Sequence, residues 1–143
     1  MAAVAVLRES ITELCVADHQ NDPETLDRWL RNKTIEHFHC WLADPSNFLV
    51  VATIESVVLG IALVDVRGDI RLCYVRPGRE RQGIGRAMLR ALEAQACQWR
   101  LKEVRLGSSL NARGFYEHHG YRFTGESAPA FGVVTGYGYV KAL

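Results

Sequence analysis

The spacing of apolar residues changes along the chain from a helical period to a strand period. In the first third, Ile11, Leu14 and Val16 form the apolar edge of a predicted helix over about residues 10–19. Asp22 before Pro23 predicts the start of a second helix, and Thr34 predicts the start of a third. Their apolar positions are Leu26, Trp29, Leu30, Ile35, Phe38, Trp41 and Leu42.

The middle and the end of the chain predict strands that alternate with helices. Residues 48–54 and 57–64 are rich in β-branched side chains and predict a hairpin, which Gly68–Asp69 connects to a strand over 70–75. A helix follows at about 83–100. The further predicted elements are a strand at 102–106, a short helix at 109–119, and strands at 121–123 and 133–140. This order predicts the α/β class, with a single mixed, mostly antiparallel sheet flanked by helices.

Length and composition narrow the functional classes. A chain of 143 residues predicts one domain over residues 1–143, long enough to bury roughly 70% of its unfolded surface. The net charge of +1 argues against nucleic-acid and membrane-surface partners, and no apolar run approaches the ~20 residues of a membrane span. The apolar start, residues 1–7, is short for a signal peptide and lacks a basic leader. Four scattered cysteines favour reduced thiols and a cytoplasmic protein: Cys15, Cys40, Cys73 and Cys97.

A glycine turn after the strand at 70–75 is the clearest candidate site. Pro77 cannot donate to a sheet and ends the strand, whereas Gly83 and Gly85 allow a ligand to approach the backbone at the start of the next helix. The free amides and the dipole of a helix N-terminus favour an anion. Three arginines add positive charge to the same place: Arg79, Arg81 and Arg86. The turn therefore predicts a pyrophosphate site.

The turn matches neither of the common nucleotide-binding motifs. It is not a dinucleotide fingerprint, because Met88 stands where the third glycine or an alanine belongs, and no Gly-Lys-Ser/Thr of a P-loop follows. A single Gly-x-Gly is common and often binds nothing. The position between a strand and a helix, with the three arginines, favours binding.

Two motifs together make the chain resemble the GCN5-related N-acetyltransferase (GNAT) family. Gly83–Ile84–Gly85 matches the core of its acetyl-CoA motif, Gln/Arg-x-x-Gly-x-Gly/Ala. Residues 112–121, Ala-Arg-Gly-Phe-Tyr-Glu-His-His-Gly-Tyr, are similar to its Ala-x-x-Phe-Tyr-x-x-x-Gly-Phe element. The likeness runs from about residue 48 to the C-terminus. Glu80 stands where the family has Gln or Arg, and Ser109 where many members have Asn. We expect the carboxylate of Glu80 to turn away from the phosphates, which would repel it.

The resemblance implies acetyl-CoA as the acetyl donor and a transferase that needs no metal. The pantetheine arm would lie along the strand 72–75, a backbone amide near Tyr74 or Val75 would polarise the thioester carbonyl, and the pyrophosphate would bind amides of residues 81–86. Ser109 would contact the pantetheine, and Phe115 would pack against the donor. The predicted donor-binding residues are Cys73, Tyr74, Val75, Arg81, Gln82, Gly83, Ile84, Gly85, Arg86, Ser109 and Phe115.

Tyr116 is the candidate general acid, because a phenol with a pKa near 10 is protonated at neutral pH and can donate to the departing thiolate. Packing in the core is the alternative role of Tyr116. The general base stays open among His19, Glu55, Asp65, Asp69 and a chain of waters. Cys73 on the donor strand allows an acetyl-cysteine intermediate, but it has no evident histidine partner, so direct transfer is favoured.

The remaining histidines predict no metal site. His37 and His39 lie two apart on a helix and face different directions, whereas His118 and His119 suit the end of a helix.

The acceptor, a primary amine on a small molecule or peptide, is not identified by the sequence. By resemblance, residues 18–33 and 127–139 would shape its pocket, with Asp18 or Asp22 attracting a cation. The aromatic candidates are Trp29, Phe131, Tyr137 and Tyr139. A non-catalytic acetyl-CoA sensor, a transferase for longer acyl groups, and a homodimer are open alternatives.

Overall fold

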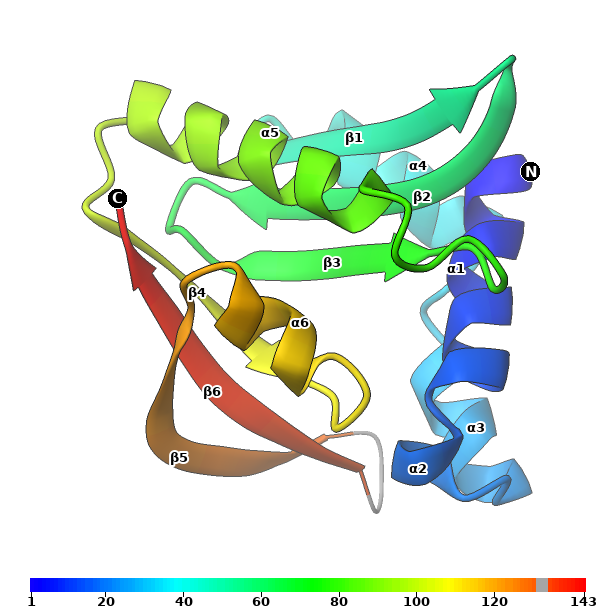
Figure 1. Cartoon of the computed structure of the whole chain (residues 1–143). Coiled ribbons are helices and arrows are strands. Elements are labelled where there is room, and N and C mark those ends of the chain that lie inside the picture. The colour runs from blue at the N-terminus through cyan, green and yellow to red at the C-terminus, as the bar shows by residue number, and fades with distance from the viewer. Residues whose placement is uncertain (131–133) are drawn as a thin grey trace.

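The computed structural model describes residues 1–130 and 134–143 and contains two groups of strands flanked by helices (Figure 1). In chain order the elements are α1 (Ala2–Leu14), α2 (Val16–His19), α3 (Pro23–Leu30), α4 (Ile35–Ala43), β1 (Asn47–Ile54), β2 (Val57–Asp65), β3 (Ile70–Val75), α5 (Ile84–Gln98), β4 (Glu103–Ser108), α6 (Arg113–His118), β5 (Arg122–Ala130) and β6 (Val134–Ala142).

The strands form two three-stranded antiparallel sheets, in the orders β1-β2-β3 and β4-β6-β5. A single parallel bridge between Asp69 and Arg105 joins them, and the Arg105 amide donates to the Gly68 carbonyl at 2.8 Å. The predicted mixed α/β fold, with antiparallel strands flanked by helices, is confirmed. The expected single sheet is divided in two, because β3 and β4 separate beyond this bridge instead of pairing along their length.

Helices cover both faces of the first sheet. Helix α5 packs on one face, and α1 and α4 pack on the other (Figure 1). Strand β2 is therefore buried on both faces: Ala62 and Val64 belong to the core under α5, and Ile61 and Leu63 to the core under α1. The core under α5 continues into the second sheet through Val104, Leu106 and Tyr139. The α5 side thus holds the two sheets at a fixed separation.

Two predicted helix starts are confirmed by their caps. A carboxylate oxygen of Asp22 accepts from the Thr25 amide at 3.0 Å, and the Thr34 hydroxyl accepts from the His37 amide at 3.2 Å. The side chains satisfy amides that lack a partner within the helix.

The first helix is longer than predicted and is interrupted. The expected helix over 10–19 is instead α1, which begins at Ala2, and the short α2, with a break at Cys15. The apolar spacing already starts at Ala3, Val4 and Leu7, all of which are buried. Those residues had been considered only as a leader sequence.

The last strands also differ from the expectation. Strand β5 extends to Ala130, although the sequence predicted only residues 121–123. Most of β5 is exposed, so it lacks an apolar pattern, and pairing with β6 defines it. Helix α6 is shorter than the predicted 109–119. Val133, the expected start of the last strand, lies outside the described residues.

Within residues 1–130 and 134–143, no helix combines the length and the apolar character needed to cross a membrane. The four cysteines are free thiols.

Candidate active site

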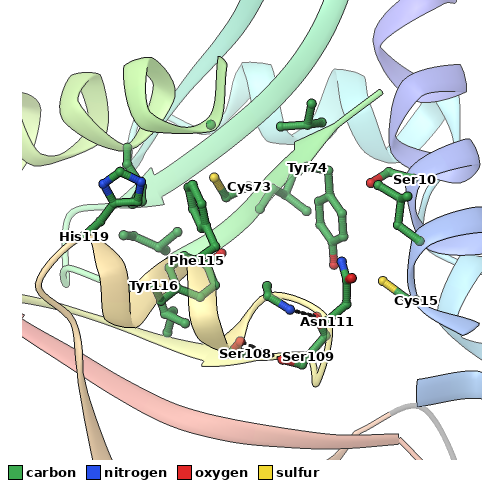
Figure 2. A pocket seen from close by; sticks show the side chains of 18 of the residues that line it. Ser10, Cys15, Cys73, Tyr74, Ser108, Ser109, Asn111, Phe115, Tyr116 and His119 are labelled. Carbon is green, nitrogen blue, oxygen red and sulfur yellow. Dashed lines mark hydrogen bonds between the residues drawn. The ribbon is translucent and has the colours of Figure 1, made fainter. Parts of the chain in front are cut away.

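A cleft of about 1390 Å³ opens where β3 and β4 separate. One side is formed by β3, the loop 76–83, α5 and α6, which we call the α5 wall. The other side, which we call the α1 wall, is formed by α1, by Trp29 of α3 and by Lys33. In Figure 2 Cys73, Phe115 and His119 lie toward α5, whereas Ser10 and Cys15 lie toward α1.

The loop before α5 presents its backbone to the cleft. Gly78, Arg81 and Gly83 have φ of 85°, 62° and 82°, in the left-handed region. Alternation of such residues with ordinary ones turns successive amides toward a common point, where an anion can bind. Gly83 is the N-cap of α5, and no side chain caps the helix there. The loop and the dipole of this 15-residue helix are together suited to an anion.

The two glycines of the motif serve different purposes. A Cβ built on Gly83 meets nothing within 4 Å, so its positive φ is what requires glycine. A Cβ on Gly85 would lie 2.9 Å from Cζ of Phe115. Gly85 therefore makes room for the Phe115 ring rather than only for a ligand, and this packing joins α6 to the first turn of α5.

Tyr116 and Cys73 meet at the centre of the α5 wall. Tyr116 is 6% exposed, and its hydroxyl lies near the Cys73 thiol. Burial, and to a lesser degree Cys73, raises the pKa of Tyr116 well above its ordinary value, so the phenol holds its proton. Burial raises the pKa of the Cys73 thiol to about 12. A protonated thiol is a poor nucleophile, which favours direct transfer over an acetyl-cysteine.

His119 belongs to the cleft rather than only to the end of a helix. Its ring packs edge-to-face on Phe115 at 4.7 Å and lies beside His118 at 5.1 Å. Burial, then the charges of His118 and Arg86, lower the pKa of His119, which favours the neutral imidazole. Both histidines line the cleft, and the sequence offered only their position at the helix end as a signal.

Small polar groups line the α1 wall and face Tyr74. Ser10 of α1 is 3% exposed, and Cys15, the residue that follows α1, is 2% exposed. The Tyr74 side chain is directed from β3 toward Asn111 (Figure 2) and is hydrogen-bonded to Trp29. Burial raises the pKa of Cys15 to about 12, and the charge of Asp18 adds to the effect. Sequence analysis missed Ser10, Cys15 and Asn111, because only the fold brings them to one cavity.

The proposed general bases are not part of the cleft. His19 is fully buried, with Nε2 directed at the carbonyls of Ile11 and Thr12 (3.0 and 3.1 Å) and Nδ1 accepting from the Asn21 amide. Glu55 lies in the β1–β2 turn, and Asp65 and Asp69 lie near the β2–β3 turn. The structure therefore brings none of these four candidates to the cleft.

Several acceptor candidates have structural roles instead. Tyr139 is 1% exposed and donates to Glu117 at 2.6 Å, and the Arg113 guanidinium lies 4.2 Å from the Tyr137 ring centroid. Neither tyrosine lines the cleft, because both pack against Arg113. Asp22 caps α3. Trp29 does line the cleft, and Phe131 lies outside the described residues.

Asp18 does not line the cleft but is hydrogen-bonded to one of the loops that do. It is 5% exposed, and its Oδ1 accepts from the Leu110 amide at 2.8 Å. Its Oδ2 is buried and has no hydrogen-bond partner within the part of the chain that the structure describes. The contact ties α2 to the β4–α6 loop, which carries Ser109 and Asn111.

The structure brings most of the predicted donor-binding residues to the cleft. Those that line it are Cys73, Tyr74, Val75, Arg81, Gly83, Gly85, Arg86, Ser109, Phe115 and the candidate acid Tyr116. Gln82 is exposed outside it, and the Ile84 side chain belongs to the core, so only its backbone is near the loop. Glu80 is exposed and lines the cleft. The Ser109 hydroxyl accepts from the Ala112 amide at 3.3 Å.

Comparisons with known proteins agree with this geometry. A GCN5-related N-acetyltransferase from Rhodopseudomonas palustris superposes with a TM-score of 0.85 at 22% identity, covering 99% of this chain and 88% of that one. The PaiA N-acetyltransferase from Thermoplasma acidophilum, in complex with coenzyme A, gives 0.77 at 19% identity over 98% and 90% of the chains. A GNAT acetyltransferase from Elizabethkingia anophelis with acetyl-CoA bound gives 0.59 at 18% identity over 92% and 90%.

These identities show a shared fold. None of the curated proteins matches the chain. The family model for the acetyltransferase (GNAT) domain matches residues 11–135, which is most of the chain and includes both motifs. The chain therefore belongs to the GNAT acetyltransferase family.

Proposed function

We propose that this protein transfers the acetyl group of acetyl-CoA to a primary amine by direct attack within a ternary complex. The observation that carries the proposal is the cleft between β3 and β4, where an anion-binding loop and a buried, protonated tyrosine share one wall. Solved neighbours that hold coenzyme A or acetyl-CoA support the choice of donor.

The open edge of β3 fits an extended pantetheine arm. Residues Leu72–Val75 pair with β2 on one side, and on the other side they do not pair with β4. Backbone groups on this free edge can pair with the amides of the arm, as an added strand would. An amide near Tyr74 or Val75 then polarises the thioester carbonyl.

The loop 76–83 and the first turn of α5 fit the pyrophosphate. The left-handed residues direct amides into the cleft, and Arg79, Arg81 and Arg86 line it there. Because the phosphates are bound at this end, the length of the pantetheine arm determines where the thioester lies along β3. The thioester would then lie beside Tyr116.

The transfer step needs one nucleophile and one acid. The amine nitrogen attacks the thioester carbonyl carbon, and a carbon–nitrogen bond forms as the carbon–sulfur bond breaks. The thiolate takes the proton of the Tyr116 hydroxyl, and the amine loses its extra proton to water, which returns a proton to the tyrosine. The sum is an amide and free coenzyme A thiol.

Release of coenzyme A thiol from acetyl-CoA, measured across a panel of primary amines, tests the proposal. We expect release that depends on the amine and saturates with it. Saturable binding of coenzyme A by calorimetry, without turnover on any amine, would instead identify a non-catalytic acetyl-CoA-binding module. A preference for propionyl- or succinyl-CoA over acetyl-CoA would identify a transferase for longer acyl groups.

A further inference from the structure

A second cavity of about 300 Å³ adjoins the cleft on the α1 wall. Its lining residues are Asn32, Lys33, Trp41, Leu63, Ile70, Arg71, Leu72 and Gly107. Five of these, Lys33, Ile70, Arg71, Leu72 and Gly107, also line the large cleft. The recess therefore adjoins the cleft, and two cationic side chains, Lys33 and Arg71, line it.

Lys33 is held in a buried position. It is 4% exposed, and it follows α3 in a turn in which its amide donates to the Leu30 carbonyl at 3.0 Å. The Arg8 guanidinium donates to the carbonyls of Leu30 and Lys33, each at 2.9 Å. Burial lowers the pKa of Lys33 to about 8, and the charge of Arg71 lowers it further. The Lys33 ammonium donates to Oδ1 of Asn32 at 2.5 Å, and Lys33 and Arg71 line the same recess.

A bulge in β3 places Arg71 at this recess. Leu63 pairs with Leu72 and Val64 with Ile70, so Arg71 is an extra residue without a partner on β2. Such a bulge redirects a side chain, and bulges are frequent beside active sites. Arg71 reaches the Asn47 side chain at 3.5 Å, which in turn donates to the Trp41 carbonyl at 3.2 Å.

The acidic residues of the cleft lie elsewhere. Among residues 1–130 and 134–143, no aspartate lines either cavity. Glu80 and Glu93, which line the large cleft, belong to the α5 wall. Two cations brought together by the fold favour an anion between them.

We propose that Lys33 and Arg71 bind an anionic group of the acceptor, so that the acceptor is an amine bearing a carboxylate or a phosphate. This inference rests on the proposed function and names its substrate class. Arg71 precedes Tyr74 and Val75 by three to four residues, or about 10–13 Å along a strand. Because both cationic side chains are long, the amine and the anionic group are separated by several bonds.

Matched pairs of amines test this assignment by kcat/KM for coenzyme A thiol release. Lysine against cadaverine isolates a carboxylate, and O-phosphoethanolamine against ethanolamine isolates a phosphate. We expect the anionic member of one kind of pair to be favoured by at least about tenfold, the size of one charge-assisted hydrogen bond. The kind of pair that shows the preference identifies the anionic group.

Variants connect that preference to the recess. We expect the ratio to fall toward one in Lys33→Met and in Arg71→Gln. It is unchanged in Arg31→Gln, an exposed arginine that pairs with Asp27 and lines neither cavity. Arg71 is exposed, so its variant tests the site independently of the change in stability that Lys33→Met brings. Preference for the neutral amine, or a ratio that survives both changes, overturns the proposal.

Loss of the proposed function gives a different result. If no amine releases thiol, acetyl transfer is wrong, and the anion site is then tested by binding alone. N-acetyltyrosine and inorganic phosphate are titrated into the coenzyme A complex of the wild type and of Arg71→Gln. Binding that weakens in the variant supports the anion site, and no binding or equal affinity overturns it.

Discussion

The two walls of the cleft are built in different ways. The α5 wall comes largely from one continuous segment, in which a strand, a left-handed loop and a helix follow one another from β3 to α5. The α1 wall is assembled from side chains that are distant in sequence, such as Ser10, Trp29 and Lys33. In the function that we propose, the α5 wall would bind the donor mainly through backbone groups, and the α1 wall would bind the acceptor through side chains.

The sharpest test of this comparison is Tyr116→Phe. Loss of the proton donor on the α5 wall predicts a fall in kcat of about a hundredfold or more, with little change in coenzyme A affinity. Steady-state kinetics and calorimetry measure the two quantities. Tyr121→Phe is the matched control, because this buried tyrosine contacts the Tyr116 ring at 5.6 Å but donates to Glu93 and does not line the cleft. An unaltered kcat in Tyr116→Phe would show that another group, or water, protonates the thiolate.

The pH dependence of the stability of Lys33→Met tests the α1 wall. The pKa of lysine is 10.5 in the unfolded chain, whereas the pKa of Lys33 in the folded protein is about 8. Between pH 8 and pH 10.5 the unfolded state therefore binds more protons than the folded state. The wild type therefore gains stability as pH rises from 8 to 10.5. At pH 7 the variant is more stable by up to about 3 kcal/mol, from 1.36 kcal/mol per pKa unit.

We expect this advantage to shrink steadily toward pH 10.5 in chemical denaturation. Lys102→Met is the control, because Lys102 is exposed and its charge stays in water in both states. A difference that does not change with pH would mean that Lys33 is charged in the folded protein throughout this range.

Gly85→Ala tests whether the α5 wall depends on packing as well as on backbone. The added methyl would meet Phe115 at 2.9 Å, and such overpacking costs about 1–3 kcal/mol of unfolding free energy. Gly114→Ala, in α6, has nothing within 4 Å of its Cβ and is expected to gain about 0.5–1 kcal/mol. Equal stabilities in urea denaturation would show that Phe115 moves aside freely.

Arg81→Gly separates backbone conformation from charge on the same wall. Glycine relieves the left-handed φ of 62° and stabilises by up to about 1 kcal/mol. Loss of the cation weakens coenzyme A binding severalfold at low salt and less at high salt. Arg100→Gly is matched, with the same φ of 62° outside the cleft, and is expected to change stability alone. Unchanged binding by Arg81→Gly would leave the phosphates to the amides and the other arginines.

Local signals in the sequence determined the fold class and most of the α5 wall. Pro77 stops β3, Gly83 accepts a positive φ, and Asp22 and Thr34 cap helices through neighbours three residues away. These interactions depend on residues close in the chain, so they can be identified before folding is known. The family motif added Tyr116 and Phe115 in the same way.

Tertiary structure alone decided the rest. That β3 and β4 separate beyond one bridge is visible only in the folded chain, because strand pairing joins residues distant in sequence. His19 could not be excluded as a base until its contacts with Ile11, Thr12 and Asn21 were known. Lys33 meets Arg71 only because a loop after α3 packs beside a strand 38 residues later. The burial of a site and the charges around it depend on residues that are distant in sequence. The order of residues along the chain therefore does not reveal them.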